Sequence, residues 1–258
     1  MNRFDFGQNP GNLYLRADGD DSADGLTPST ARLTIPGIAA LLPRYPSVSV
    51  AGKGMCHVDV GPGVFAVPTV MSMNNCVFNG VPDQSEFNIA STNLTLVACS
   101  QLTFNDIVFG NDKQANGKSI IVAASPRVDL NRVAFRGVDC VVAAQAGRVI
   151  LKDIEDGVLP GDHYMNRNSL RAWSGGVIEV VGDCTLLHSR GLNVNTGGRI
   201  LIQGHLNLLG PAGDHPLVAD SDGVIAPGET GGALTIEDSV GAALITNGGR
   251  VDFPLPLA

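Results

Sequence analysis

Short runs of alternating apolar and polar residues, each preceded by glycine, recur along the second half of the chain. The segment SGGVIEVVGD, which begins at Ser174, aligns position by position with TGGRILIQGH, which begins at Thr196. Glycine can adopt a positive φ without a Cβ clash, and alternating polarity is typical of a half-buried strand. The constant offset from Ser174 to Thr196 indicates stacked coils, each made of a turn and a short strand.

Related segments lie on both sides of this pair: AGRVILKD upstream, and TGGALTIED and NGGRVDF downstream. In the first half of the chain, a second and slightly longer constant offset relates Phe78-Asn79, Phe104-Asn105 and Leu130-Asn131, and it also relates Phe109 to Phe135. Asparagines in register on successive coils can form an amide ladder, and phenylalanines in register can stack. We interpret these residues as contacts between coils rather than as catalytic groups.

The composition fits a solenoid with a core of small aliphatic side chains, because 44% of residues are hydrophobic but only 5% are aromatic, with 32 glycines and 15 prolines. We predict an all-β, single-domain, right-handed parallel β-helix of roughly nine or ten coils over residues 47–258. Residues 13–46 are expected to form a capping strand, turn and helix. Residues 1–12 are polar and are expected to form an N-terminal docking arm.

The predicted capping helix follows a helix-start signal at residues 27–30, which read TPST. Apolar residues for one helix face follow between Ala31 and Leu42, although Pro36 is expected to break or kink the helix. Such a helix would cover the open end of the first coil, where unpaired strand edges invite aggregation.

The order of these parts, a short strand from Leu13, an Asp-rich turn and then DGLTPSTARLTI, resembles the opening of right-handed parallel β-helix proteins. Among these are phage tailspikes or tail fibres and pectate-lyase-like proteins. The resemblance implies a homotrimeric phage virion protein. Taken with the short arm and the lack of a recognisable catalytic pair, it favours a non-enzymatic structural protein that binds the host surface or neighbouring virion proteins. The alternatives are a polysaccharide lyase or hydrolase of the same fold, and a capsid-decorating or baseplate protein.

Four acidic residues gather in the turn that precedes the predicted helix: Asp18, Asp20, Asp21 and Asp24. Their spacing resembles an oxygen-ligand loop for a structural Ca²⁺, although the Gly at position six and the Glu at position twelve of an EF-hand are absent. The alternative is a turn held by hydrogen bonds from the backbone to the Asp side chains. Both remain open, and no other cofactor is expected.

The sequence contains one candidate catalytic patch. Neither the paired carboxylates of a glycoside hydrolase nor a nucleophile elbow is recognisable. A lyase would use carboxylates beside a basic side chain. The candidate group is Lys152, Asp153, Glu155 and Asp156, with Asp129, Arg132 and Arg136 about one coil earlier. The stretch from Lys152 to Asp156 also fits an ordinary strand that ends in a polar turn.

The longest interruption of the repeat, residues 157–176, gathers aromatic, amide and guanidinium side chains. Such groups recognise sugars or neighbouring subunits, because a ring stacks on an apolar face while polar groups fix hydroxyls or chains. A packed surface loop is the third interpretation. The candidate contact residues for a host glycan or a partner are Asp162, His163, Tyr164, Asn166, Arg167, Arg171 and Trp173.

The charge and the cysteine content limit which partners and which cellular compartment we expect. The net charge is −8 with scattered Lys and Arg, so neither nucleic acid nor a membrane is an expected partner. No signal peptide is recognisable, and we expect a protein made in the host cytoplasm and carried in the virion. The five Cys form no CxxC pair and lie near multiples of one coil apart, which predicts an inward stack of buried thiols.

Overall fold

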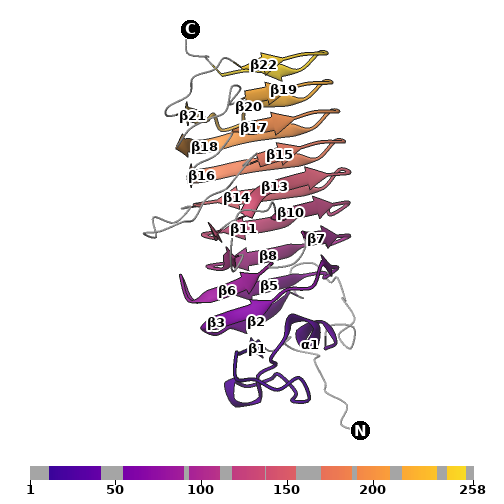
Figure 1. Ribbon diagram of the computed structural model, residues 1–258, viewed down its shortest axis with the longest axis vertical. Helices are drawn as coiled ribbons and strands as arrows, with labels where there is room; N and C mark the ends of the chain where they lie inside the picture. The colour runs from indigo at the N-terminus through magenta and orange to yellow at the C-terminus, as the bar shows by residue number, and fades with distance from the viewer. Residues whose placement is uncertain are drawn as a thin grey trace.

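The computed structural model describes residues 12–41, 55–89, 93–110, 118–136, 138–154, 170–187, 191–209, 217–236 and 243–253. Their strands lie one above another in a column, with β1 and α1 at the lower end of Figure 1 and β22 at the upper end. The fold is nearly all β, and its strands pair in parallel from coil to coil. The predicted parallel β-helix is therefore confirmed.

Three sheets make up the column among the described residues. The first sheet has eleven strands, in the spatial order β1 (Leu13–Leu15), β2 (Cys56–Val60), β5 (Cys76–Asn79), β8 (Leu102–Asn105), β11 (Val128–Asn131), β14 (Arg148–Lys152), β16 (Val177–Leu187), β18 (Arg199–Leu209), β20 (Val224–Pro227) and β23 (Arg250–Val251), with β21 (Ala233–Ile236) paired to β18. The second sheet has eight strands: β4 (Val70–Met71), β7 (Leu94–Val97), β10 (Lys118–Ala123), β13 (Val138–Ala144), β15 (Leu170–Ala172), β17 (Leu192–Val194), β19 (Leu217–Ala219) and β22 (Leu244–Ile245). The third sheet has four: β3 (Gly63–Ala66), β6 (Ser85–Asn88), β9 (Val108–Gly110) and β12 (Ala134–Arg136).

The predicted count of nine or ten coils is too high for the described residues. A complete coil needs a strand in both long sheets, and the second sheet has eight strands. The prediction divided the chain by a single coil length, but the coils differ in length. Arg148 pairs with Val177 in the next coil, and Val177 pairs with Arg199 in the coil after that, so the first of these two steps takes up more of the chain than the second.

The repeat that relates Ser174 to Thr196 is confirmed along β16 and β18. These strands pair over eleven consecutive positions, from Val177 opposite Arg199 to Leu187 opposite Leu209. The apolar residues of the repeat point inward, so that Ile178 and Ile200 are both fully buried. A constant offset therefore corresponds to one coil stacked directly on the next.

The doubled glycine of the repeat forms a tight corner between the second sheet and the first. Thr196 and Gly197 have φ values of 50° and 70°, as in the hairpin turns that need two positive φ values. Gly198 comes next, and a Cβ at this position would overlap the Ala172 carbonyl oxygen of the preceding coil. Consecutive positive φ values recur at Gln145-Ala146, Ser174-Gly175, Ser221-Asp222 and Asn247-Gly248.

One apolar core runs inside the column and includes a cluster of phenylalanines. The rings of Phe78 and Phe104 stack with centroids 5.3 Å apart, and those of Phe109 and Phe135 with centroids 6.3 Å apart. Phe87 packs edge-on against both Phe78 and Phe104. The predicted stacking of phenylalanines on successive coils is confirmed.

A short helix, α1 (Ile35–Ala39), packs against β1 at the lower end of the column. Thr34 caps α1 by accepting a hydrogen bond from the Gly37 amide, and the Ile35 and Ile38 side chains are buried in the core. The expected effect of Pro36 is wrong. Pro36 lies in the first turn of α1, where its missing N–H leaves no helix hydrogen bond unmade.

The helix-start signal at residues 27–30 forms a separate element. Pro28–Thr30 is a 3-10 turn, η1, capped by reciprocal hydrogen bonds between Thr27 and Thr30. The capping strand, turn and helix thus occur in the predicted order. The proposed docking arm lies almost wholly outside the described residues.

The prediction of an inward stack of buried thiols is confirmed in part. Cys56, Cys76, Cys99 and Cys184 are buried, and Cys56 lies opposite Cys76. The stack does not continue, because Cys76 pairs onward with Leu102 and Cys184 pairs with Leu206. Cys140 is half-buried in the second sheet, opposite Ser119. Burial raises the pKa of the Cys184 thiol to about 11, so this thiol stays protonated at neutral pH.

Within the described ranges, no helix has the length and apolar character needed to cross a membrane.

Candidate functional site

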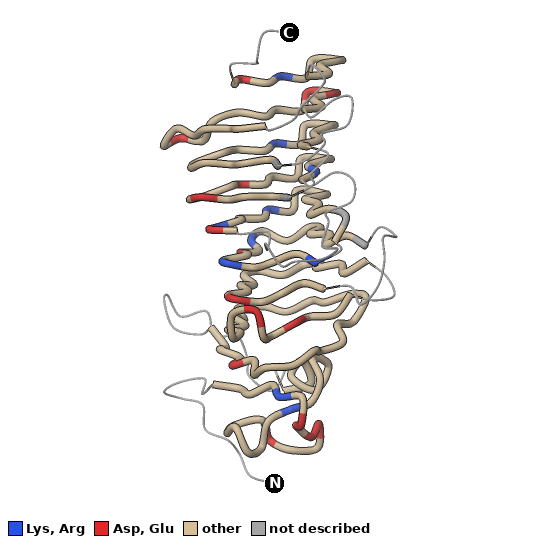
Figure 2. The backbone as a smooth tube through the Cα atoms, turned by 60° about the vertical axis from the view of Figure 1, so that its left-hand side comes forward, with Lys and Arg blue, Asp and Glu red and all other residues tan. Residues whose placement is uncertain are grey.

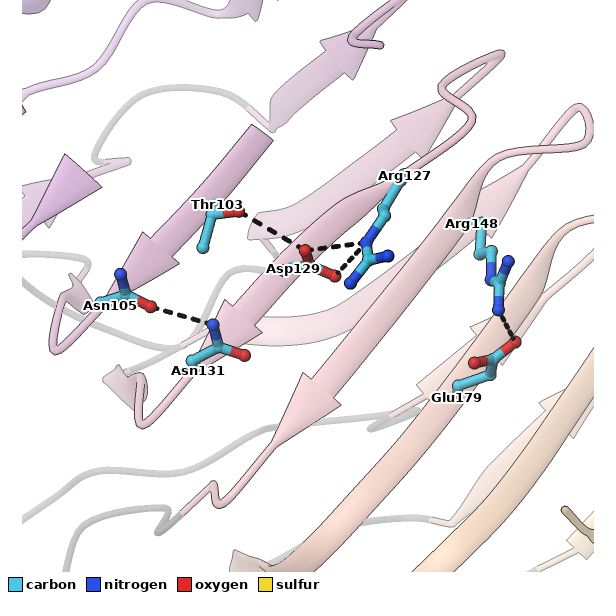
Figure 3. A network of polar contacts seen from close by, with 7 residues as sticks. All are labelled: Thr103, Asn105, Arg127, Asp129, Asn131, Arg148 and Glu179. Atoms are coloured by element: carbon cyan, nitrogen blue, oxygen red, sulfur yellow. Dashed lines mark hydrogen bonds and ion pairs between the residues drawn. The ribbon is translucent and has the colours of Figure 1, made fainter. Parts of the chain in front are cut away.

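The outward surface of the first sheet carries an asparagine ladder, as predicted. Asn79, Asn105 and Asn131 occupy equivalent positions on β5, β8 and β11. The Asn105 amide donates to the Asn79 oxygen at 2.8 Å. The Asn131 amide donates to the Asn105 oxygen at 2.9 Å, as Figure 3 shows. Each of these hydrogen bonds joins asparagine side chains on successive coils, and the ladder therefore links three coils.

Beside the ladder, two carboxylates are paired with arginines (Figure 3). Asp129 on β11 accepts from the Arg127 Nε at 2.9 Å and from the Thr103 hydroxyl at 3.4 Å. Glu179 on β16 lies 2.7 Å from an Arg148 nitrogen. The Asp129 and Glu179 residues are only 6% and 8% exposed, whereas the side chains of their partners Arg127 and Arg148 are 50% and 47% exposed. The hydrogen bond to Glu179 raises the pKa of Arg148.

Two more ion pairs connect coils away from this surface. Arg132 binds both carboxylate oxygens of Asp106, at 2.8 and 2.7 Å. Arg136 on β12 reaches Glu86 on β6 at 3.1 Å and thereby spans β9 between them. Arg132 and Arg136, considered above as the basic groups of a lyase, are both paired with carboxylates outside the candidate patch.

Of the candidate catalytic residues, Lys152 and Asp153 lie where β14 of the first sheet ends. Lys152 is an exposed residue at the end of β14, in register with Asn131 on one side and Val181 on the other. Asp153 follows with a φ of 50°, and its negative charge helps to raise the pKa of Arg132. Asp129 is paired with Arg127 instead, while Glu155 and Asp156 lie outside the described residues.

In the Asp-rich turn of the cap, Asp side chains accept hydrogen bonds from the backbone, as the alternative of a hydrogen-bonded turn predicts. Asp21 accepts from the Leu33 and Thr34 amides and from the Thr34 hydroxyl, and Asp20 accepts from the Ser22 amide. Asp24 accepts from the Leu26 amide and from the Thr30 hydroxyl. Burial opposes ionisation of Asp21, but the hydrogen bonds from Thr34 and Leu33 hold its pKa below the ordinary value.

The binding of Ca²⁺ at this turn stays a prediction. Across the described part of the chain, no group of three or more His, Cys, Asp or Glu side chains is placed to hold a metal ion.

Two of the seven predicted contact residues lie in the described structure. Arg171 on β15 places its guanidinium carbon 4.3 Å from the centre of the Trp173 ring, a cation–π contact. Both side chains are half-buried. Asp162, His163, Tyr164, Asn166 and Arg167 lie outside the described residues.

Arg171 belongs to a row of outward-facing residues along the second sheet, which we call the charge-poor row. Pairing in register from β4 to β22 joins its members, of which Arg171 is the single charged residue. The charge-poor row consists of Val70, Thr95, Ile121, Val142, Arg171, Asn193, Val218 and Leu244.

Beyond the Asp-rich turn of the cap, acidic and basic positions are interspersed along the column rather than gathered by sign (Figure 2). The asparagine ladder was predictable from the sequence because its offset is constant. Arg127, Arg148 and Glu179 were not predicted as a site, because they carry no motif. The charge-poor row could have been found by extending the alignment of the Ser174 and Thr196 segments backward, which sets Arg171 over Asn193.

In comparisons with protein-family models, with curated proteins and with solved structures, this chain gave no match.

Proposed function

We propose that the chain is a non-enzymatic structural protein of a phage particle, of the tailspike or tail-fibre type, that works as a homotrimer. Its β-helix would serve as a rigid column that contacts neighbouring virion proteins or the host surface. The parallel β-helix of the structure is the fold that the resemblance at the start of the sequence implies.

The observation that carries this proposal is that outward carboxylates of the column are held in ion pairs. Asp106, Asp129, Glu86 and Glu179 are each paired with an arginine. A carboxylate that is held in an ion pair stabilises its coil, and its oxygens are occupied by the arginine rather than available to a substrate. These pairs suit a scaffold better than a catalytic groove.

The cap supports the same role. The strand, the Asp-rich turn and α1 occur in the order shared with tailspike-type proteins, and α1 covers one end of the column. A covered end prevents strands from adding there, so that growth into fibres is blocked and a defined particle component results.

The test is the mass of the purified protein in solution, measured by light scattering during gel filtration with and without chelator. One chain has a mass of 26.8 kDa, and the proposal expects three times that mass. A loss of assembly in chelator would add a structural Ca²⁺ to the proposal. A mass of a single chain at all concentrations would contradict the trimer.

A polysaccharide assay tests the enzymatic alternative. Wild-type protein is incubated with acidic polysaccharides, and unsaturated or reducing sugar ends are measured. The proposal expects no release. Release that is lost in Asp153→Asn would overturn the non-enzymatic role and favour a lyase or hydrolase.

A further inference from the structure

We propose that the charge-poor row is the surface through which one copy of this chain packs against other copies. The inference rests on the proposed homotrimer and names the face that would form it. Three features of the row carry the argument: its charge, its exposed apolar side chains and its unpaired polar atoms.

The first feature is charge. The chain has a net charge of −8, so that copies brought together at random repel one another. The charge-poor row has eight residues, of which only Arg171 is charged, and its charge is positive. Two copies can therefore meet along this row without bringing carboxylates together.

The surface of the first sheet differs in this respect. Its outward side chains include Arg127, Asp129, Arg148 and Glu179, and they form pairs within one copy. Burying this surface against a second copy would require desolvation of charges that are already satisfied, which is unfavourable. Between the two long sheets, the second sheet is the better contact surface.

The second feature is exposed apolar area. Five large apolar side chains of the described residues are exposed, and two of them belong to the charge-poor row: Val70 at 55% and Leu244 at 39%. These two residues mark the two ends of the row. Between them, Ile121 and Val218 are half-buried and Val142 is buried. Covering such side chains yields about 25 cal/mol for each Å² of apolar area removed from water.

The third feature is a pair of unsatisfied polar atoms at the centre of the row. The Arg171 Nε and the Asn193 Oδ1 are shielded from solvent and have no hydrogen-bond partner, and the two residues are in register on β15 and β17. A shielded donor or acceptor without a partner costs about 1–3 kcal/mol. A second copy that reorients Arg171 would allow both atoms to be paired, so association relieves a cost that the single chain bears.

The experiment compares two valine substitutions that are matched in residue type and exposure. Val70 lies on the charge-poor row, and Val64, 58% exposed, lies on β3 of the third sheet. The test variant is Val70→Glu, and the control is Val64→Glu. We expect the test variant to have the mass of one chain in light scattering, while Val64→Glu keeps the mass of the wild type.

Trp173 gives a second readout that needs no variant, because it is the single Trp of the chain and lies beside Arg171. We expect acrylamide quenching of its fluorescence to increase at least twofold when wild-type protein is diluted through dissociation. The same increase is expected for the test variant at high concentration. This readout decides the question if circular dichroism shows that the test variant does not fold.

The outcomes separate this inference from the proposed function. A wild type that assembles, with a folded test variant that assembles equally well, overturns the charge-poor row as the interface but leaves the homotrimer standing. A wild type that remains a single chain overturns both. Protection of Trp173 by an added polysaccharide in a single-chain protein would instead make this row a glycan contact.

Discussion

At the scale of single residues, the two glycines of a corner have different roles. At Gly175, Gly197 and Gly231 the first glycine has a positive φ and a Cβ there would meet open space, while the glycine that follows lies against the backbone of the preceding coil. The first position accepts a side chain where that side chain tolerates positive φ, since Asp222 occupies it in one coil with a φ of 64°. The second position has no room for any side chain.

This difference predicts opposite outcomes for neighbouring substitutions. Gly198→Ala should lower the free energy of unfolding by about 1–3 kcal/mol, because the added Cβ forces the two coils apart. Gly197→Asn should change it by less than about 1 kcal/mol. Urea unfolding followed by Trp173 fluorescence measures both variants. Equal effects of the two substitutions would contradict the proposed division of roles.

A second prediction at this scale concerns Asp21 and pH. The pKa of Asp21 is held below its ordinary value of 3.8, so its hydrogen bonds stabilise the fold above that pH and are lost as the pH falls through the lower folded pKa. Asp21→Asn should therefore reduce stability by about 1 kcal/mol at pH 7, with a smaller difference near pH 3.

Urea midpoints at the two pH values check this prediction. Asp18→Asn is the control, because Asp18 makes none of the hydrogen bonds described for Asp21. A difference between wild type and Asp21→Asn that does not depend on pH would contradict the assigned role of the carboxylate.

At the scale of elements, α1 determines how the column begins. The helix has only five residues, so it depends on its contacts with the column rather than on its own hydrogen bonds. Ile38 is fully buried in the core, whereas Ala40 at the end of the helix is exposed.

Ile38→Lys should detach this cap, because an unpaired ammonium cannot be buried in an apolar core, at a cost of at least about 2 kcal/mol. The uncovered strand edge should then promote aggregation, which light scattering at 37 °C would detect. Ala40→Lys should remain soluble, since it places a cation at the exposed helix end. Aggregation of both variants, or of neither, would count against a capping role for α1.

The elements also show what could be predicted from the sequence. Positions at a constant offset, such as Asn105 over Asn79, were predicted because equal spacing in the chain becomes equal position in the column. The pair Arg136 and Glu86 was not, because its members lie 50 residues apart with β9 between them. Pro36 was misjudged because its effect depends on which residue begins the helix, and Thr34 rather than Thr27 caps it.

At the scale of the whole molecule, the unequal coils limit prediction of its length. The cap and the repeat are local in sequence, so their presence follows from short segments. The number of coils depends instead on how many residues separate equivalent positions of successive coils, and this varies from coil to coil. The candidate contact residues share this difficulty, because five of the seven lie outside the described residues.

The pairing of β16 with β18 implies that the column can change in length only by whole coils. Removing residues 177–198 joins Gly176 to Arg199, and every residue that follows keeps its inward or outward direction, because Val177 and Arg199 are equivalent. Removing one residue more reverses that direction along the next strand. The whole-coil deletion should retain the circular dichroism spectrum of a β-protein and a cooperative melting curve, and the deletion that is one residue longer should lose the latter. Genetic insertions and deletions would then be tolerated only when they add or remove a whole number of coils.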